Sequence, residues 1–494
     1  MTLRTGRIAA VTVLVTALSI TDQIPPAAAI SPPSVNPASV PADGRPGPEE
    51  PMRQSNICAQ AIAAPQPAVT LPAPGFTMLN IEQAWQFSTG HGVSVAVIDT
   101  GINPHPRLPV TGGGDYITGA DGLSDCDAHG TVVASVIAAA PNGTPMPRPM
   151  PQRPAFPPLA GQSPPVQQPG PRPTAVPDGL VGVAPHATLI AIRQSSRAFQ
   201  PQNPGAGDLE ARRKAGTVST LARAIVHAAN LGAKVINVSV AACVSAADPL
   251  DQSAIGAAVW YAATSRDAVI VAAAGNAGEE NCAQNPTVEP LGDQDPRGWS
   301  HVRTVSSPSW FSDYVLSVGA VDPTGLPIDK SLAGPWVGVA APAVGIIGLS
   351  AQTGGPVNAY PPARPGEPDS PFWGTSFAAA YVSGVAALVR ARYPELSARQ
   401  VIERIQRTAH NPARGVDNQV GYGVVDPTAA LTFNVGTGPR TVPGAQTRVI
   451  TPAAAPPPPD HRARNVAVVF TITVMAGTML AAAITRARRA RRAR

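Results

Sequence analysis

The stretch that decides the fold is residues 374–392, GTSFAAAYVSGVAALVRAR. Gly374 permits a tight backbone, and Thr375 and Ser376 are residue types that favour helix N-termini. A nearly uncharged run of small and branched residues follows, which predicts a helix buried on most sides. A serine in the first turn of this helix would lie at the positive end of the helix dipole, where its own N–H can stabilise an oxyanion. Taken alone, the stretch also fits a simple N-cap serine on a core helix.

Apolar runs and helical patterns alternate along the chain before this helix. This alternation predicts an α/β fold with right-handed crossovers and a central, mostly parallel sheet flanked by helices. The expected strands are 93–98, 187–192, 234–240, 268–274, 314–318 and 336–339, and the expected helices are 132–140, 219–229, 253–264, 378–393 and 398–408.

Two polar residues occupy informative positions in this pattern. Asp99 ends the first apolar strand, at the edge where open α/β sheets carry their sites, although Asp-Thr-Gly also suits a plain turn. His129 stands where a helix begins, a place that favours a neutral imidazole over a cation; an incidental surface histidine is the alternative. Asp99, His129 and Ser376 together form an orienting carboxylate, a base and a nucleophile, in the chain order of the subtilisins.

The flanking residues make this set specific. VAVIDTGI at 95–102, HGTVVA at 129–134, GVAP at 182–185 and GTSFA at 374–378 together resemble the subtilisin-like serine proteases over residues 79–431. The resemblance implies the three-layer subtilisin-like fold, Asp99, His129 and Ser376 as catalytic triad, and Asn276 as side-chain donor of the oxyanion hole. For Asn276 alone, a turn amide after Gly275 is the simpler interpretation.

The sequence departs from that family in two places. Ser239-Val-Ala-Ala242 replaces Ser-Leu-Gly-Gly on the strand that lines the primary specificity pocket, and the added methyl groups predict narrower backbone access. After the serine the family commonly has Ala-Ala-Pro-His, and Ala379-Ala380-Tyr381 replaces the end of that motif here, which predicts a change in packing that leaves the triad intact. No acidic cluster has calcium-loop spacing, so we expect no metal and no cofactor.

Both ends of the chain carry membrane or export signals. Arg4 and Arg7 precede an apolar run and the small residues 27–29, which is typical of a secretory signal peptide, with a short anchor as the alternative. Residues 466–484 are uncharged and long enough to span a bilayer, and the six arginines of 486–494 place the tail in the cytoplasm by the positive-inside rule. The tail accounts for the net charge of +5, and the body shows no basic face for nucleic acid.

The four cysteines, Cys58, Cys126, Cys243 and Cys282, allow three pairings, and the sequence alone does not choose among them. The signal peptide, cysteine-bearing arm, proline-rich insertion and C-terminal span together resemble the mycosins, the membrane-anchored subtilases of bacterial type VII secretion systems. On that resemblance we expect Cys58 to pair with Cys126, pinning the arm beside His129, and Cys243 to pair with Cys282.

The expected organisation is a signal peptide (1–29), a proline-rich arm (30–77), a protease domain (78–435) with a proline-rich insertion (141–178), a linker (436–464), a transmembrane helix (465–485) and a basic cytoplasmic tail (486–494). The predicted function is a membrane-anchored, extracytoplasmic serine endopeptidase that cleaves secreted proteins and associates with a type VII secretion membrane complex. The alternatives are a structural subunit of that complex, with proteolysis dispensable, and a general envelope protease with no secretion partner.

Overall fold

The computed structural model describes residues 30–148, 177–203, 215–248, 251–279, 281–287, 295, 297–413, 415–441 and 462–492, with side chains in the last range from 474 to 489. The predicted signal peptide, most of the proline-rich insertion and most of the linker lie outside these residues. The chain divides into two compact units, residues 1–447 and 448–494.

The first unit is built on a seven-stranded sheet with the order β11-β10-β8-β6-β2-β4-β3. All neighbouring strands in it are parallel. The strands are β2 (Ser94–Asp99), β3 (Val110–Asp115), β4 (Thr188–Arg193), β6 (Val235–Val238), β8 (Val269–Ala273), β10 (Val315–Val321) and β11 (Val337–Pro342). From β2 the chain builds β3 and β4 on one side, then returns to build β6, β8, β10 and β11 on the other. The strand order therefore reverses at β2, and ligand sites of open α/β sheets lie at such a reversal.

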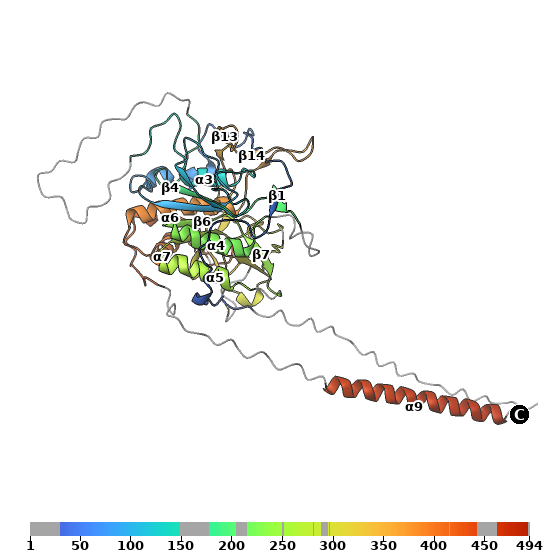
Figure 1. Cartoon of the computed structure of the whole chain (residues 1–494). Helices are drawn as coiled ribbons and strands as arrows, with labels where there is room; N and C mark the ends of the chain where they lie inside the picture. Colours follow the sequence, from blue (N-terminus) through green and yellow to red (C-terminus); the bar gives the residue numbers. More distant parts are fainter. Residues whose placement is uncertain are drawn as a thin grey trace, which may run out of the picture. The chain divides into compact units, whose positions relative to one another are not determined.

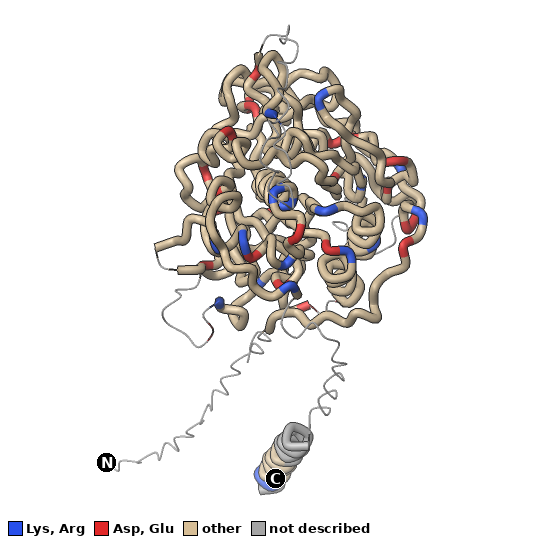
Figure 2. Tube along the Cα trace, turned by 90° about the vertical axis from the view of Figure 1, so that its left-hand side faces the viewer, with Lys and Arg blue, Asp and Glu red and all other residues tan. Residues whose placement is uncertain are grey.

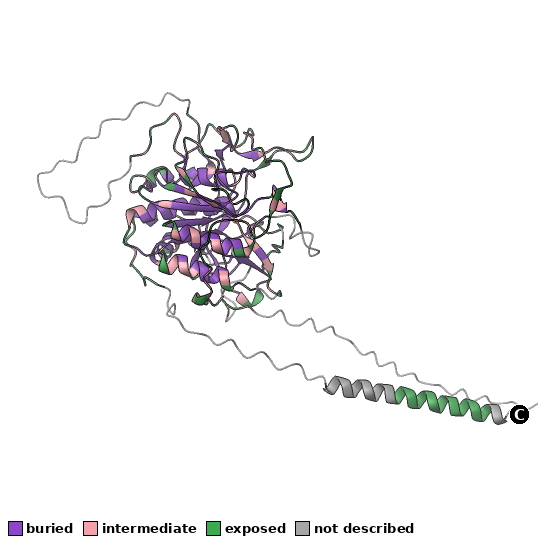
Figure 3. Cartoon of the chain, in the orientation of Figure 1, coloured by how far each residue is buried: buried purple, intermediate pink, exposed green. Residues whose placement is uncertain are grey.

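Helices cover both faces of this sheet and give three layers (Figure 1). Successive side chains of a strand point to opposite faces of the sheet. On one face, Val95 and Val97 of β2 pack with α3 (Gly130–Ala138) and α6 (Thr375–Arg392). On the other face, Ala96 and Ile98 pack with α4 (Val218–Asn230) and α5 (Ser253–Trp260). The helices α7 (Ala398–Thr408) and α8 (Pro427–Thr432) join the α6 side. The buried residues concentrate in the sheet and in the inward helix faces (Figure 3).

Short elements complete the first unit. The small antiparallel pairs are β1 (Met52–Gln54) with β5 (Phe199–Pro201), β7 (Ala242–Ser245) with β9 (Thr304–Ser307), β12 (Gly348–Leu349) with β13 (Pro356–Val357), and β14 (Ala359–Tyr360) with β15 (Ser370–Pro371). The remaining helical elements are α1 (Pro74–Met78), α2 (Ile81–Ala84), the 3-10 turns Pro37–Ser39 and Trp299–His301, and a π-helical turn Tyr261–Ser265 that continues α5. Basic and acidic residues are interspersed along the trace of this unit (Figure 2).

The predicted α/β fold with a central parallel sheet flanked by helices is confirmed, and two local differences have physical reasons. The strand β3 was not predicted, because its sequence VTGGGD is rich in glycine, which disfavours strands. Glycine is nevertheless required at Gly113, since a Cβ there would lie 2.4 Å from Ile190 Cγ2 of the neighbouring strand. The expected helix 253–264 changes after Trp260 into the π-helical turn.

The arm, residues 30–77, is a largely extended segment of the first unit up to α1, which begins at Pro74. Its β1 pairs with β5, and Asn358 fixes the next part by accepting from Ala64 N (2.7 Å) and donating to Ala64 O (2.9 Å). Nearer its start, Asp43 Oδ1 lies 2.8 Å from His227 Nδ1 on α4. The arm is therefore attached to the folded unit by backbone pairing, amide hydrogen bonds and an ion pair.

The second unit contains the helix α9 (Arg462–Arg492), which includes the predicted span 466–484. Within that predicted span, the side chains of residues 466–473 lie outside the described part of the chain. Within what the structure describes, no helix combines the length and apolar character needed to cross a membrane.

Candidate active site

The carboxylate of Asp99 stands at the carboxyl end of β2, where the strand order reverses. Its side chain is fully buried, and its Oδ1 accepts a hydrogen bond from Thr100 N at 2.7 Å. The same oxygen lies 2.7 Å from His129 Nδ1. The short distance in a buried position fixes the orientation of the imidazole and makes Nδ1 the protonated nitrogen of a neutral ring.

His129 is the N-cap residue of α3, and its ring connects two distant parts of the chain. Its Nε2 lies 2.9 Å from Ser376 Oγ, and its ring packs 5.1 Å from the Phe377 ring, measured between centroids. Burial lowers the pKa of His129, but the charge and hydrogen bond of Asp99, together with the charge of Asp125, outweigh that effect, so the net pKa is raised. The imidazole is thus placed to take a proton from the serine hydroxyl.

Ser376 is the second residue of α6, whose residues from Thr375 to Arg390 are all buried. The preceding Gly374 has a φ of 140°, a conformation that side-chain-bearing residues rarely adopt. A Cβ on Gly374 would lie 3.4 Å from Ser376 Oγ and 3.4 Å from Asn276 Nδ2. The glycine therefore keeps open the space between the hydroxyl and the amide.

Asn276 follows β8 and is oriented by its contacts with Thr375. Its Oδ1 accepts hydrogen bonds from Thr375 N and from Thr375 Oγ1, each at 3.0 Å. Because the oxygen is held by these two donors, the amide Nδ2 is directed toward the space beside Ser376. This arrangement, with the Ser376 N–H at the start of a helix, suits the stabilisation of an oxyanion.

Three of the residues singled out from the sequence, His129, Ser376 and Asn276, line one cleft of about 490 Å³, and Asp99 lies buried behind His129. One wall follows β4 and includes Ser195 and Ala198; the opposite wall follows β6 and β8 and includes Val240 and Gly275. The residues 239–241 line the cleft as expected, and Ser239 Oγ donates to the Ser376 carbonyl at 3.2 Å.

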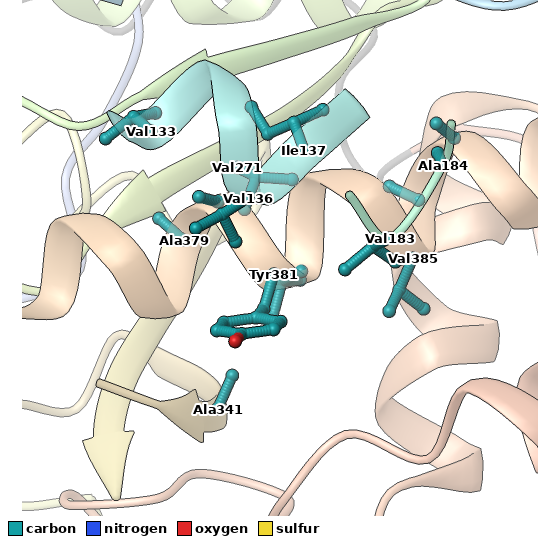
Figure 4. Close-up of a cluster of buried hydrophobic side chains, with 14 of the residues drawn as sticks. Val133, Val136, Ile137, Val183, Ala184, Val271, Ala341, Ala379, Tyr381 and Val385 are labelled. Carbon is teal, nitrogen blue, oxygen red and sulfur yellow. The ribbon is translucent and has the colours of Figure 1, made fainter. Parts of the chain in front are cut away.

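Tyr381 lies away from this cleft. It is buried in the apolar cluster beneath α3 and α6, where Val136, Ala379 and Ala341 surround it (Figure 4). Burial raises the pKa of its phenol, so the side chain stays neutral. The residue changes core packing and does not enter the site, as the sequence suggested.

Sequence reasoning missed a second buried carboxylate, Asp125. Its Oδ1 accepts from Thr100 Oγ1 (2.9 Å), and its Oδ2 accepts from Thr131 N (2.8 Å) and Thr131 Oγ1 (2.6 Å). Burial raises the pKa of Asp125 to about 6, although its hydrogen bonds with Thr131 oppose this. An acid four residues before His129 and a threonine two residues after it were the available signal, since this spacing places the acid at the start of the helix.

Two disulfides border the cleft and have the expected pairing. Cys58 bonds to Cys126, which joins the arm to the segment before His129, and Cys243 bonds to Cys282. Gln54 Nε2 lies 3.7 Å from Cys126 Sγ, and Asn56 of the arm donates to Arg197 O at 2.9 Å. The arm therefore forms part of the rim of the cleft, and Asn56, Ile57 and Ala59 line it.

An Asp, His and Ser set at the reversal point of a parallel α/β sheet defines the class of serine hydrolases with a subtilisin-like fold. Comparison with known proteins agrees, because the subtilase family matches residues 90–423. The chain belongs to the subtilase family and, within it, to the mycosins. It is a serine endopeptidase by that membership.

The relatives are similar over nearly their whole length. Mycosin-2 of Mycobacterium tuberculosis is 58% identical to this chain, and the matched region covers 98% of this chain and 98% of that relative. Mycosin-5 of Mycobacterium tuberculosis is 45% identical, and the matched region covers 89% of this chain and 88% of that relative. The crystal structure of MycP1 from Mycobacterium smegmatis is 42% identical with a TM-score of 0.73, covering 85% of this chain and 99% of that one. A chain in the periplasmic assembly from the ESX-5 inner membrane complex is 50% identical with a TM-score of 0.71, covering 87% and 100%.

Proposed function

We propose that the cleft hydrolyses peptide bonds through an acyl-enzyme on Ser376. The observation that carries the proposal is the continuous contact from Asp99 Oδ1 to His129 Nδ1 (2.7 Å) and from His129 Nε2 to Ser376 Oγ (2.9 Å). Serine is a weak nucleophile at its ordinary pKa and needs a base within hydrogen-bonding distance. Asp99, His129 and Ser376 would then be orienter, base and nucleophile.

The steps follow from these distances. Ser376 Oγ attacks the carbonyl carbon while its proton passes to His129 Nε2, and Asp99 stabilises the resulting imidazolium. The carbonyl oxygen becomes an oxyanion that accepts from Asn276 Nδ2 and Ser376 N–H. Collapse breaks the C–N bond, and the departing amine takes the proton from Nε2. Water then attacks the ester carbonyl and gives a proton to His129 Nε2. Collapse breaks the bond to Ser376 Oγ, which takes that proton back, and the acid product leaves.

We infer that the substrates are secreted proteins and that the enzyme is anchored to the inner membrane, with its catalytic unit outside the cytoplasm. The uncharged residues 466–484 before the arginine-rich 486–494, and the export-type residues 1–29, support this topology. The two disulfides are compatible with an oxidising compartment. Likeness to chains solved in ESX-5 inner membrane complexes supports association with a type VII secretion complex.

A mainly structural role in that complex is the second candidate, because the similar chains were solved as parts of an assembly. If the structural role dominates, Ser376→Ala should leave secretion intact while deletion of 465–494 abolishes it. Loss of secretion in the Ser376→Ala strain would exclude the structural role as the main one.

Labelling of the full chain with a fluorophosphonate tests the proposed chemistry directly. We expect labelling of the wild type that is absent from Ser376→Ala and strongly slowed in His129→Ala, because the reagent needs an activated serine. Ser383→Ala is the matched control, since Ser383 lies on the same helix and its hydroxyl donates to Asn237 Oδ1 at 2.9 Å instead of facing the cleft. A well-folded wild type that resists the reagent would refute the proposed function.

A further inference from the structure

An ion pair joins two exposed side chains on the lining of the cleft. Arg197 Nη2 lies 3.9 Å from Glu279 Oε2, and the side chains are 80% and 45% exposed. Both residues line the same cleft as His129 and Ser376. The charged heads are therefore located where a polypeptide has to enter.

The two residues come from opposite walls. Arg197 follows β4, on one side of the strand-order reversal at β2, and Glu279 follows β8, on the other side. The strands β2 and β6 separate β4 from β8 in the sheet, so the contact between the side chains spans the width of the cleft.

The backbone is fixed at both residues, although the side chains are exposed. Arg197 N donates to Asp127 Oδ1 (2.7 Å), and Arg197 O accepts from Asn56 of the arm (2.9 Å). Glu279 N donates to Asn276 O (3.2 Å), and Glu279 O accepts from Cys282 N (2.8 Å), next to the Cys243–Cys282 disulfide. Each charge is thus presented by an exposed side chain on a hydrogen-bonded backbone.

The other acid on this rim is already engaged. Asp127 accepts from Ser196 Oγ (2.5 Å) as well as from Arg197 N. Among the described residues that line the cleft, Arg197 and Glu279 are consequently the charged side chains with exposed heads.

An exposed ion pair of this length contributes little to folding, so an entering chain can separate it readily. When the ion pair is separated, the Arg197 guanidinium on one wall and the Glu279 carboxylate on the other wall face the polypeptide bound in the cleft. We propose that Arg197 and Glu279 close the mouth of the empty cleft and select polypeptide segments that carry both an acidic and a basic side chain around the bond to be cleaved. The acidic side chain would bind Arg197, and the basic one would bind Glu279. This inference rests on the proposed function, because it names the substrate class of the same site.

Charge reversal in the full chain tests the selection, with Arg197→Glu, Glu279→Arg and the double variant. Arg407→Glu and Glu403→Arg are controls, because these residues form an ion pair within α7 (3.5 Å) whose side chains are 50% and 25% exposed, and these substitutions change the net charge equally. Each enzyme digests peptides from a denatured bacterial proteome, and mass spectrometry identifies the residues around each cleaved bond. The pKa of His129 responds to burial, to Asp99 and also to Arg197, so the preference is measured as the ratio of charged to uncharged sites within each enzyme, where a shift of that pKa affects every peptide alike.

We expect the wild type to prefer doubly charged sites over uncharged ones by roughly two- to fivefold per charge, as exposed charge pairs allow. Arg197→Glu should replace the acidic preference with a basic one, Glu279→Arg should do the converse, and both controls should match the wild type. The preference should vanish at about 1 M salt, where screening acts within roughly 3 Å. Undiminished cleavage with an unchanged charge preference in the single variants would overturn the inference and leave the proposed function standing.

Failure of the wild type to cleave any peptide would instead count against the proposed function. The inference is then decided by binding to the Ser376→Ala chain, measured by fluorescence anisotropy. The probes are fluorescein-labelled peptide pools with acidic residues only, basic residues only, both, or no charge. Tightest binding of the mixed pool, lost when Arg197→Glu or Glu279→Arg is added, supports the inference; equal affinity for every pool overturns it.

Discussion

Asp125 holds Thr131 at the start of the helix that begins beside His129, by accepting hydrogen bonds from both its backbone N–H and its hydroxyl. Thr131 Oγ1 in turn accepts from Asn103 N at 3.1 Å, and Asn103 Oδ1 accepts from Asp125 N at 2.7 Å. The three residues form a closed hydrogen-bonded group that fixes the approach of α3 to β2. A second carboxylate thereby lies close to Asp99 without contacting the serine.

Removing the charge of Asp125 should shift the pH dependence of hydrolysis. Burial lowers the pKa of His129, and Asp99 is the main group that raises it. The charge of Asp125 also raises this pKa, so Asp125→Asn should lower it. His129 must be neutral to accept a proton, so the acidic limb of the kcat/KM profile should move to lower pH. Asp121→Asn, an exposed acid in the same loop, should leave the profile unchanged. A limb that stays in place in Asp125→Asn would contradict this electrostatic link.

The same carboxyl group should make stability depend on pH in the direction opposite to most acids. The folded pKa of Asp125 is raised to about 6 from 3.8, mainly by burial. The folded state therefore binds the proton more tightly, and this contribution is fully present below about pH 4 and lost as the pH rises through about 6. Relative to Asp125→Asn, the wild type should lose on the order of 1 to 3 kcal/mol of unfolding free energy between these pH values. Urea denaturation of both chains across this range measures the difference, and parallel curves would disprove it.

Loss of the side-chain donor at Asn276 should reduce the chemical step more than binding. Its Nδ2 faces the space beside Ser376, so Asn276→Ala should raise the barrier by about 2.7 to 4 kcal/mol, seen as a fall in kcat of about 10²- to 10³-fold with little change in KM. Thr375→Val removes one hydrogen bond to Asn276 Oδ1 but keeps the donor, so its effect should be much smaller. Equal losses in the two variants would mean that Asn276 acts only by positioning α6.

Breaking the arm disulfide should destabilise the fold and loosen the rim of the cleft. Cys58 and Cys126 close a loop with a sequence separation of 68, for which chain entropy predicts a contribution of about 4 kcal/mol. The double variant Cys58→Ser/Cys126→Ser should lose that order of unfolding free energy in guanidinium titration. It should also show faster hydrogen exchange at residues 52–62. The Cys243→Ser/Cys282→Ser pair, with a separation of 39, provides the comparison and should leave exchange in the arm unchanged.

The elements that were predicted well have strong local signals. The strands β2 and β8 are continuous apolar runs bounded by glycine or charged residues, and α7 begins at Ser397 with a capping box that the sequence displays. The strand β3 and the π-helical turn at Tyr261–Ser265 were not predicted, because neighbouring strands and packing impose them against local preference.

The sequence by itself determined the parallel α/β class, the family, and the residues Asp99, His129, Ser376 and Asn276. It could do so because strand ends, helix starts and their flanking residues are local features. Only the tertiary structure decided which other groups line the cleft: Asn56 of the arm on the rim, and Arg197 opposite Glu279. These contacts join segments that are close in space only because the strand order reverses at β2, and pairing across a sheet leaves no periodic signal along the chain.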